Sequence, residues 1–310
     1  MKKILITGGA GNIGSSLAKK LLTNNNYFVC VVDNLSTGDR QKLPSNETAN
    51  FKFIKADVNE FEDICAIMTT HKFDFVFHYA AVVGVSRTLS NPVKVLNDIE
   101  GIRNVLQLSK NTGVKRVFYS SSSEVYGEPV CFPQNEETTP LNSKLPYAIV
   151  KNIGEAYCKS YYQEFGLEYT IFRFFNTYGP SQSTDFVIPR FIKKALTGDT
   201  IYINGDGKQT RTFCYIDDNI ETTIKILEGN IGVNDVVNIG SNIEMTILEL
   251  AETIIRLIKS SSKIVHVQAL KEGDMTRRQP DNNKMLTILN RNLVSVEDGI
   301  SRLIKENISK

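Results

Sequence analysis

The sequence contains no tryptophan, only three histidines and five cysteines, and its charges nearly cancel. The cysteines are odd in number, widely spaced and without a Cys-x-x-Cys pair, which argues against a disulfide framework and a structural zinc site. The histidines also lie far apart, so no metal site is predicted. With 36 Lys and Arg against 34 Asp and Glu, the formal charge of +2 gives no reason to expect nucleic acid or an anionic membrane surface as a partner.

Long apolar runs are also missing. No run reaches the roughly 20 residues that a membrane-spanning helix needs, and the N-terminal MKKILITGG is too short for a signal peptide. A cytoplasmic location and no membrane contact are therefore expected. The 310 residues, of which 41% are hydrophobic and 23% charged, predict a folded chain of one large domain or two domains.

Strand-like and helical segments alternate through the first half of the chain. Apolar strands are expected at residues 3–7, 28–33, 51–57, 73–81, 114–123 and 167–174, and helices at 12–23, 59–70, 91–111 and 146–165. Apolar strands separated by helices indicate a parallel sheet that is covered on both faces. The predicted fold class is therefore α/β, a Rossmann-type doubly wound parallel sheet.

A glycine-rich turn, TGGAGNIG, lies between the first strand and the first helix. Gly8, Gly11 and Gly14 permit a tight turn, close approach of a pyrophosphate and close packing of the helix on the strand. Free N–H groups at the start of the helix, around Asn12 and Ile13, would face the phosphates. The alternative is a loop with clustered glycines, but the strand–turn–helix context favours dinucleotide binding.

Aspartates follow the next two strands. Asp33 ends the second strand about 20 residues after the glycines, where a carboxylate accepts ribose hydroxyls and repels a 2′-phosphate, so NAD is favoured over NADP. Asp57 and Val58 follow the third strand and are predicted to lie beside the adenine. Asp57 alone could equally be a helix-entry residue.

The pattern changes after about Asn176, where strands become shorter and turn signals denser. We predict a dinucleotide-binding domain at residues 1–175 and a smaller mixed α/β substrate domain at 176–310. Residues 235–240 are apolar enough to rejoin the main sheet, so the segment 212–240 is assigned to the first domain.

Tyr147 and Lys151 share one face of a predicted helix, because residues four apart lie one turn from each other. A lysine ammonium beside a tyrosine hydroxyl is expected to lower the tyrosine pKa from about 10 toward neutrality. Tyr147 could then act as a general base on a substrate hydroxyl, and Lys151 could also hold the nicotinamide ribose. In isolation the pair could be an ordinary feature of a surface helix.

Four serines and a glutamate, Ser120 to Glu124, end the fifth predicted strand. Ligands of doubly wound sheets bind beyond the carboxyl ends of the strands, so these side chains are candidates for the site. They could otherwise serve as turn or helix caps.

With these motifs the chain resembles the extended short-chain dehydrogenase/reductase family, and within it the nucleotide-sugar epimerases, dehydratases and decarboxylases. The resemblance covers nearly the whole chain and is carried by TGGAGNIG, VVDNLSTG, KAD, HYAA, SSSSEVYG, YAIVK, RFFNTYGP, GDGKQTRTFCYIDD and RRQPD. It implies tightly held NAD, a nucleotide diphosphate sugar (a UDP-sugar is favoured) bound between two lobes, and oxidation of a sugar hydroxyl, usually at C4. A homodimer paired through the helices at 91–111 and 146–165 is also implied.

The resemblance also implies roles for single residues. Ser122, Tyr147 and Lys151 match the catalytic set, with Ser123 and Glu124 as further catalytic candidates. Cofactor contacts are implied for Asn34, Ser36, Ala80 and Ala81 in addition to the residues named above. Substrate contacts are implied for Asn176, Arg211 and Arg278 at the diphosphate, since a guanidinium suits phosphate oxygens. Val187, Ile188 and Tyr202 are expected to line the base pocket, although they could equally be core residues.

The net reaction is left open between three outcomes. A 4-epimerase needs only Ser122 and Tyr147, whereas elimination benefits from a further carboxylate, which Glu124 supplies. Ser123 replaces the Asp that dTDP-glucose-type dehydratases use as an acid, and residues 129–146 lack the Trp-containing stretch of UDP-glucuronate decarboxylases. The sequence therefore favours elimination slightly over 4-epimerisation, with decarboxylation as a further alternative. A non-catalytic NAD-binding regulator or a simple NAD-linked reductase would be alternatives of another class.

Overall fold

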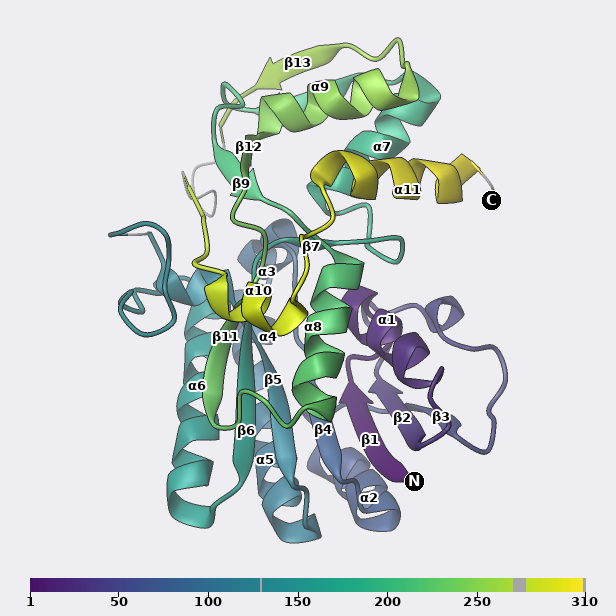
Figure 1. Cartoon of the computed structure of the whole chain (residues 1–310), viewed down its shortest axis with the longest axis vertical. Coiled ribbons are helices and arrows are strands. Elements are labelled where there is room, and N and C mark those ends of the chain that lie inside the picture. Colours follow the sequence, from purple (N-terminus) through teal and green to yellow (C-terminus); the bar gives the residue numbers. More distant parts are fainter. Residues whose placement is uncertain (129, 270–276, 309–310) are drawn as a thin grey trace.

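A seven-stranded parallel sheet forms the centre of the molecule, and a smaller lobe lies beyond the carboxyl ends of its strands (Figure 1). The computed structural model describes residues 1–128, 130–269 and 277–308. The strand order is β11-β6-β5-β4-β1-β2-β3 and every pairing is parallel. The strands are β1 (Lys2–Thr7), β2 (Tyr27–Asp33), β3 (Phe51–Lys55), β4 (Phe75–His78), β5 (Arg116–Ser122), β6 (Glu168–Phe174) and β11 (Asp235–Ile239). The order reverses between β1 and β4, which is where doubly wound sheets bind their ligands.

Helices cover both faces of this sheet (Figure 1). On one face lie α2 (Phe61–His71), α5 (Asp98–Thr112) and α6 (Pro146–Phe165), and on the other α1 (Asn12–Leu21) and α8 (Ile216–Glu228). Two apolar clusters, one on each side of the sheet, form the core. Coverage of both faces explains why most of the strand residues are apolar and buried. The predicted fold class is thus confirmed.

Helix α6 begins and ends at residue types that commonly begin and end helices. Helix α6 begins with Pro146 in its first turn and ends at Gly166, which adopts the left-handed conformation with φ 71°. It covers the predicted range of residues 146–165.

The helix predicted at residues 91–111 is instead divided. It forms α4 (Pro92–Leu96) and α5, separated at Asn97. The Glu100 N–H bonds to the carbonyl of Asn97 in a tightened turn, where the Asp98 side chain turns inward to accept the Val82 N–H at 2.7 Å.

The smaller lobe is built from the second half of the chain. It contains α7 (Val187–Thr197), α9 (Ile247–Ile258) and α11 (Val296–Ile308), with the paired short strands β8 (Ile201–Asn204) and β13 (Ile264–Val267), β9 (Thr210–Thr212) and β12 (Glu244–Thr246), and β7 (Thr177–Tyr178) and β10 (Cys214–Tyr215). The remaining helices are α3 (Val85–Ser90) and α10 (Asn283–Leu289), with one-turn helices η1 (Arg40–Lys42) and η2 (Ser123–Tyr126).

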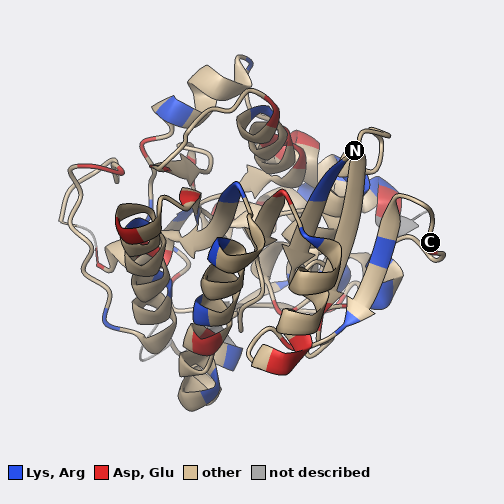
Figure 2. Cartoon of the chain, turned by 90° about the horizontal axis from the view of Figure 1, so that it is seen from below, with Lys and Arg blue, Asp and Glu red and all other residues tan. Residues whose placement is uncertain are grey.

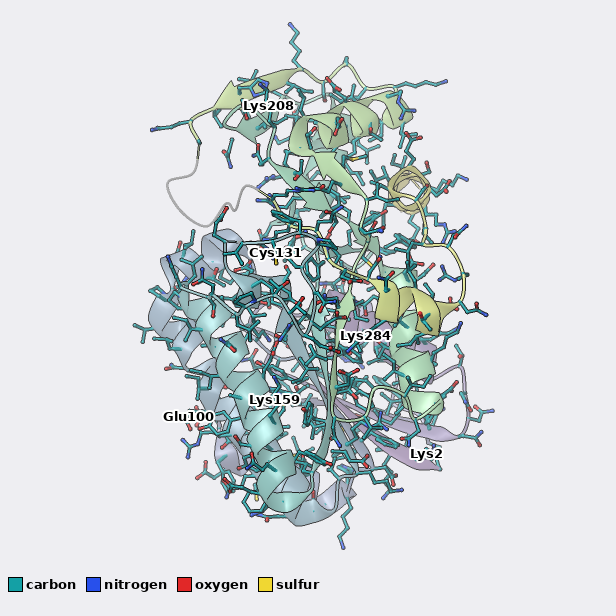
Figure 3. The ribbon with its side chains drawn as sticks, turned by 60° about the vertical axis from the view of Figure 1, so that its left-hand side comes forward. Lys2, Glu100, Cys131, Lys159, Lys208 and Lys284 are labelled. Atoms are coloured by element: carbon teal, nitrogen blue, oxygen red, sulfur yellow. The ribbon has the colours of Figure 1, made fainter. Side chains whose placement is uncertain are left out.

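The chain returns to the main sheet within its second half. Strand β11 pairs along β6, and helix α8 packs against α1. Lys284 of α10, labelled in Figure 3, bonds to the Asp235 carboxylate at 2.9 Å and so fixes α10 on β11.

Basic and acidic residues alternate along the ribbon in the view of Figure 2. Within the described ranges, no helix is both long enough and apolar enough to cross a membrane.

Candidate active site

A cavity of about 960 Å³ lies at the carboxyl ends of the strands. It is lined by all the residues predicted for the cofactor, the catalysis and the substrate. These are Gly8, Gly11, Asn12, Ile13, Gly14, Asp33, Asn34, Ser36, Asp57, Val58, Ala80, Ala81, Ser122, Ser123, Glu124, Tyr147, Lys151, Asn176, Val187, Ile188, Tyr202, Arg211 and Arg278. The fold therefore gathers segments from the whole length of the chain around one space. The role of each side chain remains a prediction.

The glycine turn is shaped by close backbone contacts. Gly8 has φ +65°, and a Cβ atom there would lie 2.5 Å from the Ala80 nitrogen, while a Cβ at Gly14 would lie 2.6 Å from the Gly9 Cα. At Gly11, which precedes α1, the nearest atom would be the Gly8 carbonyl oxygen at 3.2 Å. Side chains are thus excluded on the protein side, and the helix start with its free N–H groups borders the cavity.

Asp33 is nearly buried and bonds to two backbone groups. One carboxylate oxygen accepts the Ala10 N–H at 2.9 Å and the other accepts the Leu35 N–H at 2.8 Å. Burial raises the pKa of Asp33, and these two hydrogen bonds oppose the rise. Each oxygen retains a second lone pair, so ribose hydroxyls could still be bound from the cavity side.

Polar contacts connect the segments that follow β2, β3 and β4 at the edge of the cavity. The Asn34 side chain donates to Asp57 at 2.8 Å, which connects the ends of β2 and β3. The Thr7 hydroxyl accepts the Ala80 N–H at 3.3 Å, which holds the segment after β4 against β1.

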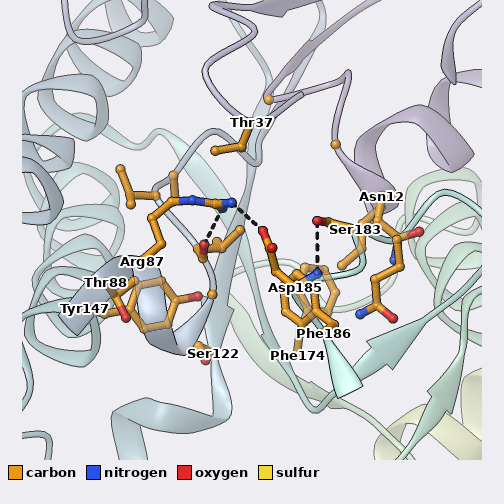
Figure 4. A pocket seen from close by; sticks show the side chains of 18 of the residues that line it. Asn12, Thr37, Arg87, Thr88, Ser122, Tyr147, Phe174, Ser183, Asp185 and Phe186 are labelled. Atoms are coloured by element: carbon orange, nitrogen blue, oxygen red, sulfur yellow. Dashed lines mark hydrogen bonds and ion pairs between the residues drawn. The ribbon is translucent and has the colours of Figure 1, made fainter. Parts of the chain in front are cut away.

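Tyr147 and Ser122 lie together in the cavity (Figure 4), and Lys151 lies beside Tyr147. The Tyr147 hydroxyl is hydrogen-bonded to the Ser122 side chain. The Lys151 ammonium lies 5.9 Å from the centre of the Tyr147 ring and donates to the Ser120 hydroxyl at 3.3 Å. Ser120 in turn donates to the His78 carbonyl at 3.2 Å. The sequence analysis includes Ser120 in the serine run but predicts no individual role for it.

The pKa of Tyr147 moves in the opposite direction to the sequence prediction. Burial raises the pKa of Tyr147, the nearby Glu124 carboxylate raises it further, and the Ser122 hydrogen bond only partly compensates. Burial also lowers the pKa of Lys151 to about 8, although Asp98 opposes this. Burial and the Glu124 carboxylate therefore favour the protonated form of Tyr147, and a positive charge beside the hydroxyl would favour the phenolate.

Glu124 and Arg278 form an ion pair at the cavity wall. The Arg278 guanidinium lies 3.4 Å from the Glu124 carboxylate, and the Arg278 side chain is 7% exposed. Ser123, between Ser122 and Glu124, is almost fully buried. The sequence placed Arg278 at the diphosphate and did not predict its contact with Glu124.

The predicted substrate residues surround the lobe side of the cavity. Asn176 has φ 36° and donates to the Thr212 carbonyl at 3.0 Å. Arg211 donates to the Thr210 carbonyl at 2.7 Å. Tyr202 is more than half exposed, whereas Ile188 is 1% exposed and also belongs to the core.

Further charged groups that line the cavity had no sequence signal, among them Asp98, Arg87 and Asp185. Asp98 is a buried carboxylate on α5. The Arg87 guanidinium, in α3, lies 2.5 Å from the Asp185 carboxylate, in the segment before α7. This ion pair connects α3 to the smaller lobe across the cavity (Figure 4).

These features define a Rossmann-type enzyme site for a nicotinamide dinucleotide. The glycine cradle, the carboxylate at the end of β2 and the Tyr147–Lys151 pair fit NAD. Among the described residues, no group of three or more His, Cys, Asp or Glu could hold a metal ion.

Comparisons with known proteins identify the family. Residues 4–240 match the NAD dependent epimerase/dehydratase family. The chain is 38% identical over 297 residues to a UDP-N-acetyl-alpha-D-glucosaminuronate decarboxylase of Bacillus cytotoxicus, covering 92% of this chain and 90% of the relative. A UDP-glucose 4-epimerase of Thermotoga maritima, solved with UDP-glucose, superposes with a TM-score of 0.92 at 32% identity over 99% of both chains. A dTDP-glucose 4,6-dehydratase of Streptomyces venezuelae, solved with NAD, gives 0.90 at 28% identity, over 99% of this chain and 97% of that one.

The chain therefore belongs to the NAD-dependent epimerase/dehydratase family, in the extended short-chain dehydrogenase/reductase group, and its cofactor is NAD.

Proposed function

We propose that the protein oxidises C4 of a UDP-linked hexuronate and then removes its C6 carboxylate as carbon dioxide. The observation that carries this proposal is the composition of the site beyond Ser122 and Tyr147. Glu124 borders the cavity next to Ser123 and Ser122, and the resemblance implies that Ser123 replaces the Asp that dTDP-glucose-type dehydratases use as an acid. The similarity to a UDP-sugar acid decarboxylase over nine tenths of the chain supports the same reaction.

The first step requires a base and a hydrogen-bond donor at the C4 hydroxyl. Tyr147 accepts the proton of that hydroxyl, Ser122 orients it, and Lys151 stabilises the phenolate and holds the nicotinamide ribose. NAD supplies the hydride acceptor and, through its cationic nicotinamide ring, the additional positive charge that Tyr147 needs.

The second step needs few groups, because a ketone at C4 makes a C6 carboxylate the carboxylate of a β-keto acid. The C5–C6 bond breaks, carbon dioxide leaves, and the electron pair of that bond stays on the sugar as the enolate of the C4 ketone, so no acid is required for the leaving group. One proton must then be added at C5, and the donor proposed here is Glu124 in its acid form, since this residue borders the cavity. The hydride removed in the first step returns to C4, so the overall reaction is redox-neutral. A 4,6-elimination would instead require Glu124 to remove the C5 proton and another acid to protonate the departing C6 hydroxyl.

Elimination, which the sequence favoured, remains the second candidate because Glu124 could serve as its base. The sequence argument against decarboxylation rested on the short, Trp-free segment before Tyr147. The decarboxylase relatives weigh against that argument. In a 4-epimerase, Glu124 would neither deliver a proton to C5 nor remove one from it. The similarity to the Thermotoga enzyme supports 4-epimerisation as the third candidate.

The test is incubation of the purified protein with UDP-, dTDP- and GDP-linked hexoses and hexuronates, followed by mass spectrometry of the products. Loss of carbon dioxide from a uronate supports the proposal. Loss of water from a hexose would establish elimination, and an isomer of unchanged mass would establish epimerisation.

A homodimer formed through α5 and α6 is proposed as well, and sedimentation equilibrium tests it.

A further inference from the structure

A buried ion pair connects the helix that carries Tyr147 to the strands beneath it. Arg173 of β6 donates to both carboxylate oxygens of Glu155 on α6, at 2.9 and 2.7 Å. The two side chains are 2% and 1% exposed. Ser121 of β5 also donates to Glu155, at 2.6 Å. Glu155 lies one turn after Lys151, and Ser121 directly precedes Ser122.

The same arginine extends the contacts toward the segment that carries Arg278. Arg173 donates to the Tyr126 hydroxyl at 2.8 Å, and that hydroxyl donates to Asn238 of β11 at 2.8 Å. The Asn238 side-chain amide then donates to the backbone carbonyls of Gln134 and Asp281, at 2.9 and 3.1 Å. Asp281 lies three residues after Arg278.

Stability alone does not account for this arrangement. Removing two charges from water costs much of the free energy that their attraction contributes. An apolar pair of similar volume would often stabilise the fold equally well. What the network does provide is fixed geometry between separate chain segments. It joins α6, the ends of β5 and β6, η2, β11 and the stretch after Arg278, and each of the first three carries or adjoins a residue of the site.

We propose that Tyr126, Arg173 and Glu155 are positioning residues that set the location of Arg278 relative to Tyr147 and Ser122. The Tyr126 hydroxyl is the central member, because it lies between Arg173 and Asn238. This inference rests on the proposed function in so far as Arg278 is taken to bind the diphosphate of the substrate.

The variant Tyr126→Phe tests the role of this hydroxyl, since it removes one oxygen and leaves the ion pair in place. The matched control is Tyr27→Phe. Tyr27 is also buried, and its hydroxyl donates to Glu228 at 3.0 Å, at the far end of the sheet from the cavity. Both variants are expected to lower the melting temperature to a similar extent. Only Tyr126→Phe should weaken the binding of UDP, by roughly two- to tenfold, measured by calorimetric titration.

A double-mutant cycle identifies the residue through which Tyr126 acts. If the hydroxyl positions Arg278, Tyr126→Phe added to Arg278→Lys should weaken UDP binding scarcely further than Arg278→Lys alone. Losses that multiply would overturn the inference, as would UDP affinity in Tyr126→Phe equal to that of Tyr27→Phe.

The readout is independent of the net reaction, so a failure of the decarboxylase proposal leaves the test intact. If the wild-type protein binds dTDP or GDP in preference to UDP, the same cycle is measured with that nucleotide. Wild-type protein that binds none of the three would refute the proposed substrate class itself. Glu155→Gln provides a second measurement on the catalytic side: because Glu155 holds both Arg173 and α6, the variant should lower kcat about tenfold or more and also weaken the binding of UDP. Unchanged kcat would remove Glu155 from the positioning role.

Discussion

The carboxylate of Asp33 accepts the backbone N–H of Ala10 at 2.9 Å, so the end of β2 is tied directly to the glycine turn after β1. One side chain thus shapes the phosphate cradle and faces the position of the ribose. A substitution at Asp33 is therefore expected to affect the turn as well as the choice of cofactor.

Asp33→Asn should weaken NAD binding by about tenfold or more, because an amide nitrogen cannot accept the hydrogen bond that a carboxylate oxygen accepts. Discrimination against NADP should fall at the same time. Fluorescence titration with both cofactors measures this, with Asp206→Asn, an exposed carboxylate that does not line the cavity, as the control. Tighter binding of NADP than NAD by the wild-type protein would refute the role of Asp33.

Tyr147→Phe should reduce turnover by about 10²–10⁴-fold, the usual contribution of a general base. NAD content and nucleotide-sugar affinity should stay near the wild-type values, since the ring is retained. Tyr162→Phe, an exposed position on the same helix, is the control. Near-normal turnover in Tyr147→Phe would mean that another group is the base.

The rate should depend on pH through Lys151. Burial lowers the pKa of Lys151 to about 8, and only the protonated amine stabilises the Tyr147 phenolate, so kcat/KM should fall as the pH rises through about 8. In Lys151→Arg the guanidinium stays charged over this range, and the fall should move to higher pH at a lower maximal rate. A wild-type profile that remains flat well above pH 8 would contradict this assignment.

Glu124→Gln separates oxidation at C4 from the later proton transfer. The bound cofactor should still be reduced when substrate is added, but product formation should stall, because an amide neither delivers nor removes the C5 proton. Absorbance of the reduced cofactor and product analysis in deuterated water measure the two parts. Normal turnover and a product without deuterium at C5 would instead indicate 4-epimerisation.

The sequence was sufficient for features that depend on local order. Alternating apolar segments predicted the strands, and the glycine spacing with Asp33 predicted the cofactor end of the cavity. The helix predicted at residues 146–165 matches α6, and with it the one-turn spacing of Tyr147 and Lys151. Each of these signals lies within one element or between neighbouring elements.

Features that depend on distant parts of the chain could not be predicted in this way. Glu124 and Arg278 are 154 residues apart, and their contact arises only because α10 and the preceding segment return to β11. The raised pKa of Tyr147 also depends on tertiary structure, since it follows from burial of the side chain and from the position of Glu124. Neither the Glu124–Arg278 contact nor the pKa of Tyr147 can be predicted from the spacing of residues along the chain.

Strand β11 also constrains how the protein can be made. Residues 235–239 form the edge of the sheet beside β6, and α8 covers α1 from the same late part of the chain. A fragment that stops at residue 175 would leave a bare strand edge and an uncovered apolar face, which favours aggregation. During synthesis on the ribosome, the NAD-binding sheet can therefore be completed only after nearly four fifths of the polypeptide has emerged, so early termination should yield insoluble product and not a smaller cofactor-binding protein.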